Sequence, residues 1–256
     1  MTEGPRSYRT EAVVIRHSNF GEADRILTLF TREQGKIRAV AKGVRKLKSR
    51  KAGHLEPFTR VQLQLARGRD LPIITQAETV EAYLNIRSAL ETTAQAAYVL
   101  EVLDRFSFDN EENRELYRLA VETLQRLDAG MDPFFTNRYY ELHVLDALGF
   151  KPELFSCVIC REPLQAVDQY FSGLQGGAVC PNCMFKVEGA RPVSVDALRF
   201  LRHFQRSDFK ETLRAHPEVL VRGEMEDLLQ HYISIQLDRR LNTPGFIRAI
   251  RDNPEP

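Results

Sequence analysis

Residues 26–41 read ILTLFTREQGKIRAVA, and this stretch contains two apolar runs joined by a short polar segment. The first run, Ile26–Thr31, and the second, Lys36–Ala41, have the β-branched and apolar composition of strands. Gln34 and Gly35 between them are typical of a turn. The stretch therefore predicts two strands that are consecutive in the chain.

Further runs in about the first 80 residues predict three more strands. Residues 12–16 are apolar and mostly β-branched, and residues 71–76 have a similar composition. Val61, Leu63 and Leu65 alternate with polar neighbours, which is the period of a half-buried strand. Five short strands in such a length favour a small closed barrel, because closure leaves no exposed edge strand.

From about residue 82 the apolar residues recur at helical spacing, so the rest of the chain is predicted to be mainly α-helical. Helix starts are expected at a capping box of Asp109 and Glu112, at Asp132, and at Ser194. The last long helix is expected at about 218–241. No apolar run approaches the length of a membrane span, and the first one is too short for a signal-peptide core.

Four cysteines form two C-x-x-C pairs, Cys157 with Cys160 and Cys180 with Cys183, and nineteen residues separate the pairs. A gap of two residues lets one tight turn present both thiolates to the same ion, and two such turns complete a tetrahedron. Glycines in the intervening segment would let it fold back so that the pairs meet. The spacing predicts one structural Zn²⁺, since four thiolates leave no position for an activated water.

Reduced cysteines with a structural or redox role are the alternative explanation of the same pattern. Arg161, Glu162 and Asp168 lie between the pairs, and this slightly negative balance is unfavourable for binding phosphates. Arg161 and Lys186 are better suited to offset the negative charge of a zinc–thiolate centre. We therefore interpret the cysteine segment as a stapled insertion in the helical part of the chain.

The sixteen residues Lys36–Lys51 contain eight basic residues and no acidic residue, although the net charge of the whole chain is only +1. A surface that merely solvates a fold usually mixes both signs, and that reading remains the alternative here. The exclusion of acids favours a surface that attracts a polyanion, with nucleic acid as the first candidate. Such binding depends steeply on salt and needs no base sequence.

Unpaired bases would also stack on exposed aromatic side chains. Tyr8, Phe20, Phe30 and Phe58 are the rings available in the predicted barrel. Phe30 is expected in the core, and Tyr8 and Phe20 are expected to pack rather than to hold bases.

No catalytic motif accompanies these features: the sequence has no phosphate-binding loop, no dinucleotide fingerprint, no zinc-protease helix motif and no nucleophile elbow. The acidic groups at 109–112 and 224–227 are explained by helix capping and by a solvated helix face. The chain is therefore interpreted as a binding protein and not as an enzyme. A metal-dependent nuclease built on the acidic groups is the alternative.

Residues 8–50 resemble a known family. The segments YRTEAVVIRH at 8–17 and GEADRILTLFTREQGKIRAVAKGVRKLKSR at 21–50 are similar to the N-terminal domain of the bacterial RecO recombination mediators. The order of a barrel, a helical domain and a four-cysteine module extends the resemblance over the whole chain. Some members of that family lack the cysteines, whereas this chain has all four.

The resemblance implies an α+β multidomain protein, with an N-terminal OB-fold β-barrel followed by a mainly α-helical domain that carries an inserted zinc module. The domains are expected at 1–80 for the barrel, 81–152 for the first helical part, 153–190 for the zinc module and 191–256 for the C-terminal helical part. The basic DNA-binding surface of the family corresponds here to Lys36, Arg38, Lys42, Arg45, Lys46, Lys48, Arg50 and Lys51, with Arg67 and Arg69 as weaker additions.

The resemblance further implies a mediator of DNA repair and homologous recombination that binds single- and double-stranded DNA without sequence specificity and anneals complementary strands. With RecR, it would help to load RecA onto DNA coated by single-stranded DNA-binding protein (SSB), whose C-terminal tail is a further expected partner. A cytoplasmic, nucleoid-associated location is expected. The rival is a zinc-ribbon transcription or RNA-associated factor, which would place nucleic-acid contacts in residues 157–183.

Overall fold

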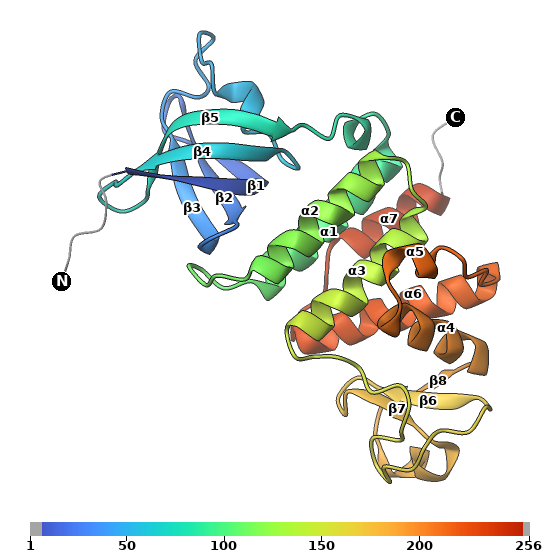
Figure 1. Cartoon of the computed structure of the whole chain (residues 1–256). Helices are drawn as coiled ribbons and strands as arrows, with labels where there is room; N and C mark the ends of the chain where they lie inside the picture. The colour runs from blue at the N-terminus through green and yellow to red at the C-terminus, as the bar shows by residue number, and fades with distance from the viewer. Residues whose placement is uncertain (1–6, 253–256) are drawn as a thin grey trace. The chain divides into compact units, whose positions relative to one another are not determined.

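The computed structural model describes residues 7–252, and the chain divides into two compact units. The first unit consists of the chain up to Gly130 together with the C-terminal residues from Phe246 on, and the second unit is Met131–Gly245. The outermost residues of the expected first and last domains, 1–6 and 253–256, lie outside the described part. The fold is mixed α+β, as predicted (Figure 1).

The first unit contains a closed barrel with the strand order β1-β2-β3-β5-β4. Its strands are β1 (Ser7–Phe20), β2 (Asp24–Thr31), β3 (Gly35–Ala41), β4 (Arg60–Ala66) and β5 (Ile73–Glu81). A parallel pairing of Val40 with Ile73 closes the barrel between β3 and β5. This is the Greek-key order of an OB-fold, and the barrel predicted from the sequence is confirmed.

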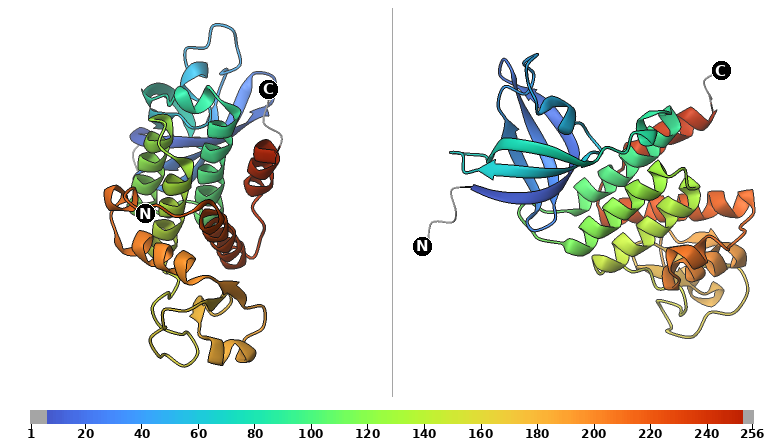
Figure 2. Two further views of the ribbon diagram at one scale, coloured as in Figure 1. Left: turned by 90° about the vertical axis from the view of Figure 1, so that its right-hand side faces the viewer. Right: turned by 45° about the horizontal axis from the view of Figure 1, so that its top comes forward.

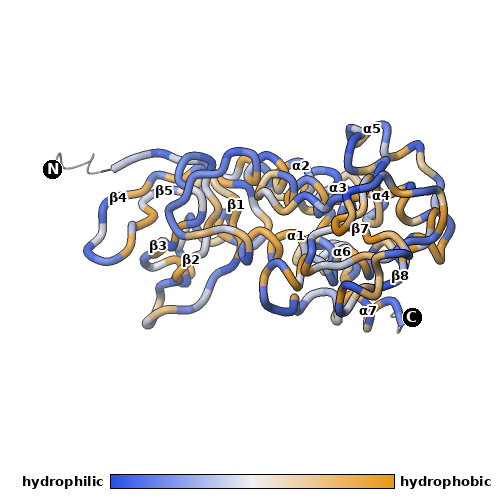
Figure 3. The backbone as a smooth tube through the Cα atoms, turned by 90° about the horizontal axis from the view of Figure 1, so that it is seen from below, coloured by the Kyte–Doolittle hydropathy of each residue, from blue (hydrophilic) through white to orange (hydrophobic). Residues whose placement is uncertain are grey.

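Alternation along the strands fills the barrel interior. On β2 and β3 the inward residues are Leu27, Leu29, Ile37 and Ala39, and the pairings set these positions opposite one another. Figure 3 shows the result as orange and blue segments in turn along the barrel strands. Two strands extend further than predicted: β1 continues to Phe20 through paired polar residues, and β5 lasts to Glu81. The added residues of β1 pair with β2 and those of β5 pair with β4, although their composition is not typical of strands.

Two helices of the first unit, α1 (Leu90–Phe106) and α2 (Arg114–Asp128), lie side by side in both views of Figure 2. The predicted capping box at the start of α2 is wrong, because the cap is Asn113, whose side chain accepts a hydrogen bond from Leu116 N at 2.9 Å. Asp109 pairs instead with the backbone of Lys36 at the start of β3. The chain before α2 therefore forms an isolated β-bridge with the start of β3.

A partly buried hydrogen-bonded network joins the barrel to α2. Glu11 Oε1 accepts from Arg60 Nε at 2.6 Å and from the Tyr117 hydroxyl at 2.7 Å. Burial opposes ionisation of Glu11, but these hydrogen bonds outweigh it and lower the pKa of the carboxyl below 4.5. Burial and the bond to Glu11 raise the pKa of Tyr117.

The lowered pKa of Glu11 predicts a pH dependence of stability. A carboxyl whose pKa is lower in the folded state stabilises the protein at pH values above its unfolded pKa, and that contribution is lost as the pH falls through the folded pKa. We expect Glu11→Gln to be destabilising at pH 7 and to flatten the loss of stability below about pH 4.5. Urea unfolding of the parent protein and of Glu11→Gln, from pH 7 down to pH 3, measures this pH dependence of stability. Parallel curves for the two proteins would contradict the role of Glu11.

The second unit packs α3 (Pro133–Ala147) against α6 (Val219–Gln236), with α4 (Val195–Arg206) and the short α5 (Phe209–Thr212) beside them. Both predicted caps are confirmed: Asp132 accepts from Phe134 N, and Ser194 accepts from Ala197 N. The prediction of one last helix to residue 241 is wrong. The helix α6 ends at Gln236, and a separate helix, α7 (Thr243–Asp252), follows it. Pro244 lies in the first turn of α7, where proline is tolerated.

A buried ion pair lies between α3 and α6. The guanidinium of Arg138 is paired in the same helix with Glu141, whose side chain is 0% exposed, and its Nη1 lies 3.3 Å from an oxygen of Glu226 on α6. Because removal of one partner leaves an uncompensated buried charge, we expect Arg138→Ala to lower the free energy of unfolding by about 3–5 kcal/mol. Arg138→Met with Glu141→Leu should cost less than Arg138→Ala in the same urea titration. A larger loss in the double variant would contradict this account.

None of the helices within residues 7–252 has the length and apolar character needed to cross a membrane.

Candidate nucleic-acid interface and metal centre

The strand β3 carries the first basic residues of the predicted surface on the outside of the barrel. Ile37 and Ala39 are buried in the barrel core, so Lys36 and Arg38, which alternate with them along the strand, point outward. Lys36 is already engaged, since its Nζ donates to Asp104 O at 2.7 Å and pairs with the Asp104 carboxylate at 3.3 Å. Arg38 is exposed.

The connection after β3 carries most of the remaining basic residues, and we call its residues 42–51 the basic loop. Its first part is tied to the β1–β2 turn: Gly43 N donates to the Asp24 carboxylate at 2.7 Å, and Arg45 N donates to Ala23 O at 3.0 Å. Gly43 has a φ of +63°, which favours glycine. The loop therefore leaves the barrel at a fixed position, and it stands out from the strands in Figure 1.

Two successive turns form the outer part of the basic loop. Lys46 N donates to Gly43 O at 3.1 Å, and Ser49 N donates to Lys46 O at 2.8 Å. The residues at the second turn, Lys46, Leu47 and Lys48, are all exposed. The last residue, Lys51, turns back, since its Nζ donates to Ile74 O on β5 at 2.8 Å. Burial lowers the pKa of Lys51, and the charge of Asp24 opposes this.

The structure therefore separates nine of the ten predicted cations into two groups, and Arg67 belongs to neither. Lys36, Arg45 and Lys51 donate hydrogen bonds within the barrel unit. A second group is exposed and makes no side-chain hydrogen bond or ion pair with any residue in the described range 7–252: Arg38, Lys42, Lys46, Lys48, Arg50 and Arg69. We call this second group the free cations.

The weaker additions Arg67 and Arg69 lie exposed on the β4–β5 connection. Pro72 at the end of that connection accepts a hydrogen bond from Val40 N on β3 at 2.8 Å, and Ile74 accepts from Lys51. These bonds bring the start of β5 beside β3 and the basic loop. Two segments that are separate in the sequence, residues 36–51 and the β4–β5 connection, thus contribute cations to neighbouring parts of the barrel.

Two aromatic predictions are confirmed and one is wrong. Phe30 is fully buried, and Tyr8 is half-buried with its hydroxyl donating to Gln34. Phe20, expected to pack, is 51% exposed. The strand β1 runs on to Phe20 and places its side chain on the outer face, whereas the sequence pattern ended the strand at Arg16. The continued alternation of Arg16, Ser18 and Phe20 was the signal that could have revealed this.

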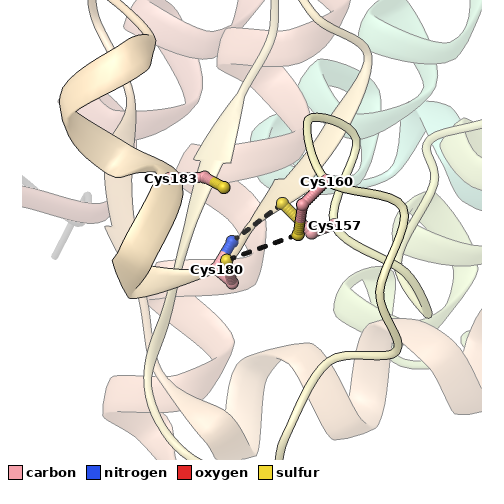
Figure 4. Close-up of side chains that lie close together, drawn as sticks. All are labelled: Cys157, Cys160, Cys180 and Cys183. Carbon is pink, nitrogen blue, oxygen red and sulfur yellow. Dashed lines mark hydrogen bonds between the residues drawn. The ribbon is translucent and has the colours of Figure 1, made fainter.

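The four cysteines come together at one point (Figure 4), and their four Sγ atoms all lie within 4.8 Å of one another. Cys160 Sγ and Cys180 Sγ are 3.8 Å apart, and all four thiols are free. Zinc–sulfur bonds of about 2.3 Å in a tetrahedron place sulfurs about 3.8 Å apart. The group can therefore hold a structural metal ion, and the predicted meeting of the two pairs is confirmed.

Backbone hydrogen bonds fix the chain at both cysteine pairs. Cys180 N donates to Cys157 Sγ at 3.3 Å, and Cys183 N donates to Cys180 O at 2.9 Å. Burial opposes ionisation of the Cys157 thiol, but backbone N–H groups at the cysteine turns outweigh it and lower its pKa to about 6. Burial raises the pKa of Cys180 and of Cys183. Because metal-bound cysteine is a thiolate, a bound ion would displace the protons of these two thiols.

A small three-stranded sheet brings the second pair to the first. It has the order β7-β6-β8, with β6 (Gln169–Ser172), β7 (Gly177–Val179) and β8 (Arg191–Val193), and the second pair lies at the 3₁₀ helix η3 (Pro181–Lys186). The β6–β7 turn needs glycine: Gly176 has a φ of +76°, and a Cβ on Gly177 would clash with Glu153. Cys157, Val179 and Cys183 form the small core. The fold-back expected from the glycines is confirmed.

The metal segment is tied to the helices of its own unit. Arg202 Nε donates to Leu154 O at 2.7 Å, and Gln205 Nε2 donates to Pro152 O at 2.8 Å. Tyr232 on α6 donates to Phe150 O at 2.9 Å. Arg161 and Lys186, next to the ligands, are exposed. The segment is thus an insertion between α3 and α4 that is hydrogen-bonded to α4 and α6.

Known proteins match both parts of the chain. The family described as "Recombination protein O N terminal" matches residues 5–83, and "Recombination protein O C terminal" matches residues 87–244. A protein of Roseiflexus sp. named DNA repair protein RecO is 39% identical over 246 residues, covering 96% of this chain and 87% of that protein. Proteins with the same name from Dehalococcoides mccartyi strain 195 (37% identity; 92% of each chain) and Pelotomaculum thermopropionicum (36%; 96% of each) are also similar.

Proposed function

Because the chain belongs to the RecO family of DNA repair proteins, we propose that it is a non-enzymatic recombination mediator that binds DNA through the barrel. The observation that carries the proposal is the group of free cations on one side of the barrel. Unpaired surface cations attract phosphates and release counterions when they bind them, without reading base sequence. Single- and double-stranded DNA both offer such phosphates.

We propose the ten predicted basic residues as the DNA site, and the structure suggests specific roles for all of them except Arg67. The free cations contact phosphates directly. Lys36 and Lys51 hold β3 and the basic loop in place through their bonds to Asp104 and Ile74. Arg45 fixes the loop through its backbone and adds charge at the β1–β2 turn.

Strand annealing follows from the same surface. Two complementary strands repel each other through their phosphates, and a cationic surface that binds both reduces the repulsion. The proposed pathway is the one expected for the family: with RecR, the protein helps to load RecA onto DNA coated by SSB, whose C-terminal tail contacts the helical domain. This work would take place on DNA in the cytoplasm.

In the second unit, we propose that Cys157, Cys160, Cys180 and Cys183 hold one structural Zn²⁺. Four thiolates at tetrahedral spacing fit zinc, which would supply a fold-stabilising cross-link. The division into a barrel at 1–80, helical parts at 81–152 and 191–256, and a zinc module at 153–190 belongs to the same proposal.

Annealing of two complementary labelled oligonucleotides tests the proposal. We expect the protein to accelerate duplex formation at about 0.1 M salt, to lose this effect at about 1 M salt, and to leave the strands intact with added Mg²⁺. Cleaved strands would support the nuclease alternative instead. Absence of both binding and annealing at low salt would overturn the proposal.

The zinc-ribbon rival is separated by Arg161→Gln together with Lys186→Gln. Our proposal expects the affinity for DNA to change less than about twofold, because these cations lie in the cysteine segment and not on the barrel. A loss of about tenfold or more, with metal retained, would favour the rival.

A further inference from the structure

The outer face of β1, β2 and β3 continues beyond the part that α1 covers. Paired residues in neighbouring strands point to the same side of a sheet. Asp104 on α1 pairs with Arg16 on β1 at 3.3 Å and with Lys36 on β3 at 3.3 Å. Phe30, the partner of Lys36, is fully buried. This marks the covered part of the face.

The uncovered part begins at the next outward-facing row of residues beyond Arg16. Ser18 pairs with Ile26, and Ile26 pairs with Val40, so these three side chains form one row across the strands. Ile26 and Val40 are half-buried and Ser18 is exposed. Phe20 pairs with Asp24 in the next row and is 51% exposed. An exposed aromatic ring therefore adjoins a small apolar floor.

Cations border this face on two sides. Arg38 is paired with Thr28, between Lys36 and Val40 on the outer side of β3. The basic loop is anchored at the other end, where the Asp24 carboxylate accepts from Gly43 N. Asp24 is the strand partner of Phe20, so the carboxylate beside the ring already accepts a hydrogen bond from the basic loop. Glu22 on the same turn is exposed, and its backbone oxygen accepts from Arg45.

We infer that this face takes unpaired nucleobases, with Phe20 as the stacking platform, Ile26 and Val40 as the floor, and Arg38 and the basic loop on the phosphates. The inference rests on the proposed function and adds a preference for single-stranded DNA. Bases in a duplex stack on one another, so their faces are not available to Phe20, whereas unpaired bases offer theirs. Cations alone would not distinguish the two forms in this way.

Phe20→Ala tests the inference. Its affinities for a 30-nucleotide oligothymidine and for a mixed-sequence duplex of the same length are measured at one salt concentration. We expect the variant to lose about tenfold in affinity for the single strand and less than about twofold for the duplex. Phe20→Tyr keeps a ring of the same size and should bind like the parent protein. Because Phe20 is exposed, the thermal unfolding temperature should not change.

Phe108→Ala is the matched control, since Phe108 is 72% exposed in the same unit but lies in an acidic segment with Asp109 and Glu111. It should leave both affinities unchanged. An unchanged single-strand affinity in Phe20→Ala, or an equal loss for both DNA forms, would overturn the inference while leaving phosphate binding intact. A parent protein that binds neither DNA would instead overturn the proposed function.

Discussion

Reversal of three free cations, Lys46→Glu with Lys48→Glu and Arg50→Glu, will lower the affinity for single-stranded DNA by about 100-fold or more at about 0.1 M salt. Each lost phosphate contact removes released counterions, and each new carboxylate repels the backbone. The three side chains are exposed and make no bonds within the described residues, so the fold should not change. Fluorescence anisotropy with a labelled oligonucleotide measures the loss, and circular dichroism checks the fold.

The matched control reverses three exposed cations of the second unit, Arg206→Glu with Lys210→Glu and Arg240→Glu. The change in net charge is the same, so a long-range effect of total charge would appear in both variants. We expect the control to lose less than about fivefold in affinity. If the basic-loop variant binds as tightly as the control, the DNA site has been placed on the wrong surface.

Cys160→Ser will abolish stoichiometric metal binding and unfold the segment from about 153 to 190. Cys160 is the exposed cysteine of the group, so its substitution removes no buried packing and isolates the effect of the metal. Structural zinc contributes about 10–16 kcal/mol in isolated zinc fingers, far more than the small core of this segment can replace. Metal content by mass spectrometry and hydrogen exchange along the chain measure both effects.

Glu162→Gln serves as the control for this variant, because Glu162 is an exposed neighbour with no place in the sulfur cluster. It should keep one metal ion per chain and normal exchange protection. The barrel of Cys160→Ser should retain its affinity for DNA within about twofold, since the DNA site is proposed in the other unit. A fully metal-loaded Cys160→Ser protein, or one whose segment stays protected, would contradict a structural four-cysteine centre.

Local patterns in the sequence predicted the features that depend on neighbouring residues. Alternation of apolar residues predicted the barrel strands, and polar residues before apolar runs predicted the caps Asp132 and Ser194. The two C-x-x-C turns predicted a cluster, because each turn fixes its own pair of thiols and the glycine-rich β6–β7 connection returns the second pair to the first.

Features that depend on distant contacts could not be predicted in the same way. The cap of α2 moved to Asn113 because Asp109 pairs with β3. Composition alone gave Lys36 and Lys51 the same role as Lys46, although Asp104 and Ile74 hold the first two. The exposure of Phe20 likewise depends on where α1 stops covering the sheet, which no local pattern encodes.

The salt dependence of single-stranded DNA binding by the full chain tests the central claim most directly. The logarithm of the dissociation constant should rise linearly with the logarithm of salt concentration, with a slope of about 4 if all six free cations contact phosphates. Oligonucleotides of different sequence should give the same slope. A dissociation constant that stays unchanged between about 0.05 and 0.3 M salt would contradict phosphate binding by the free cations of the barrel.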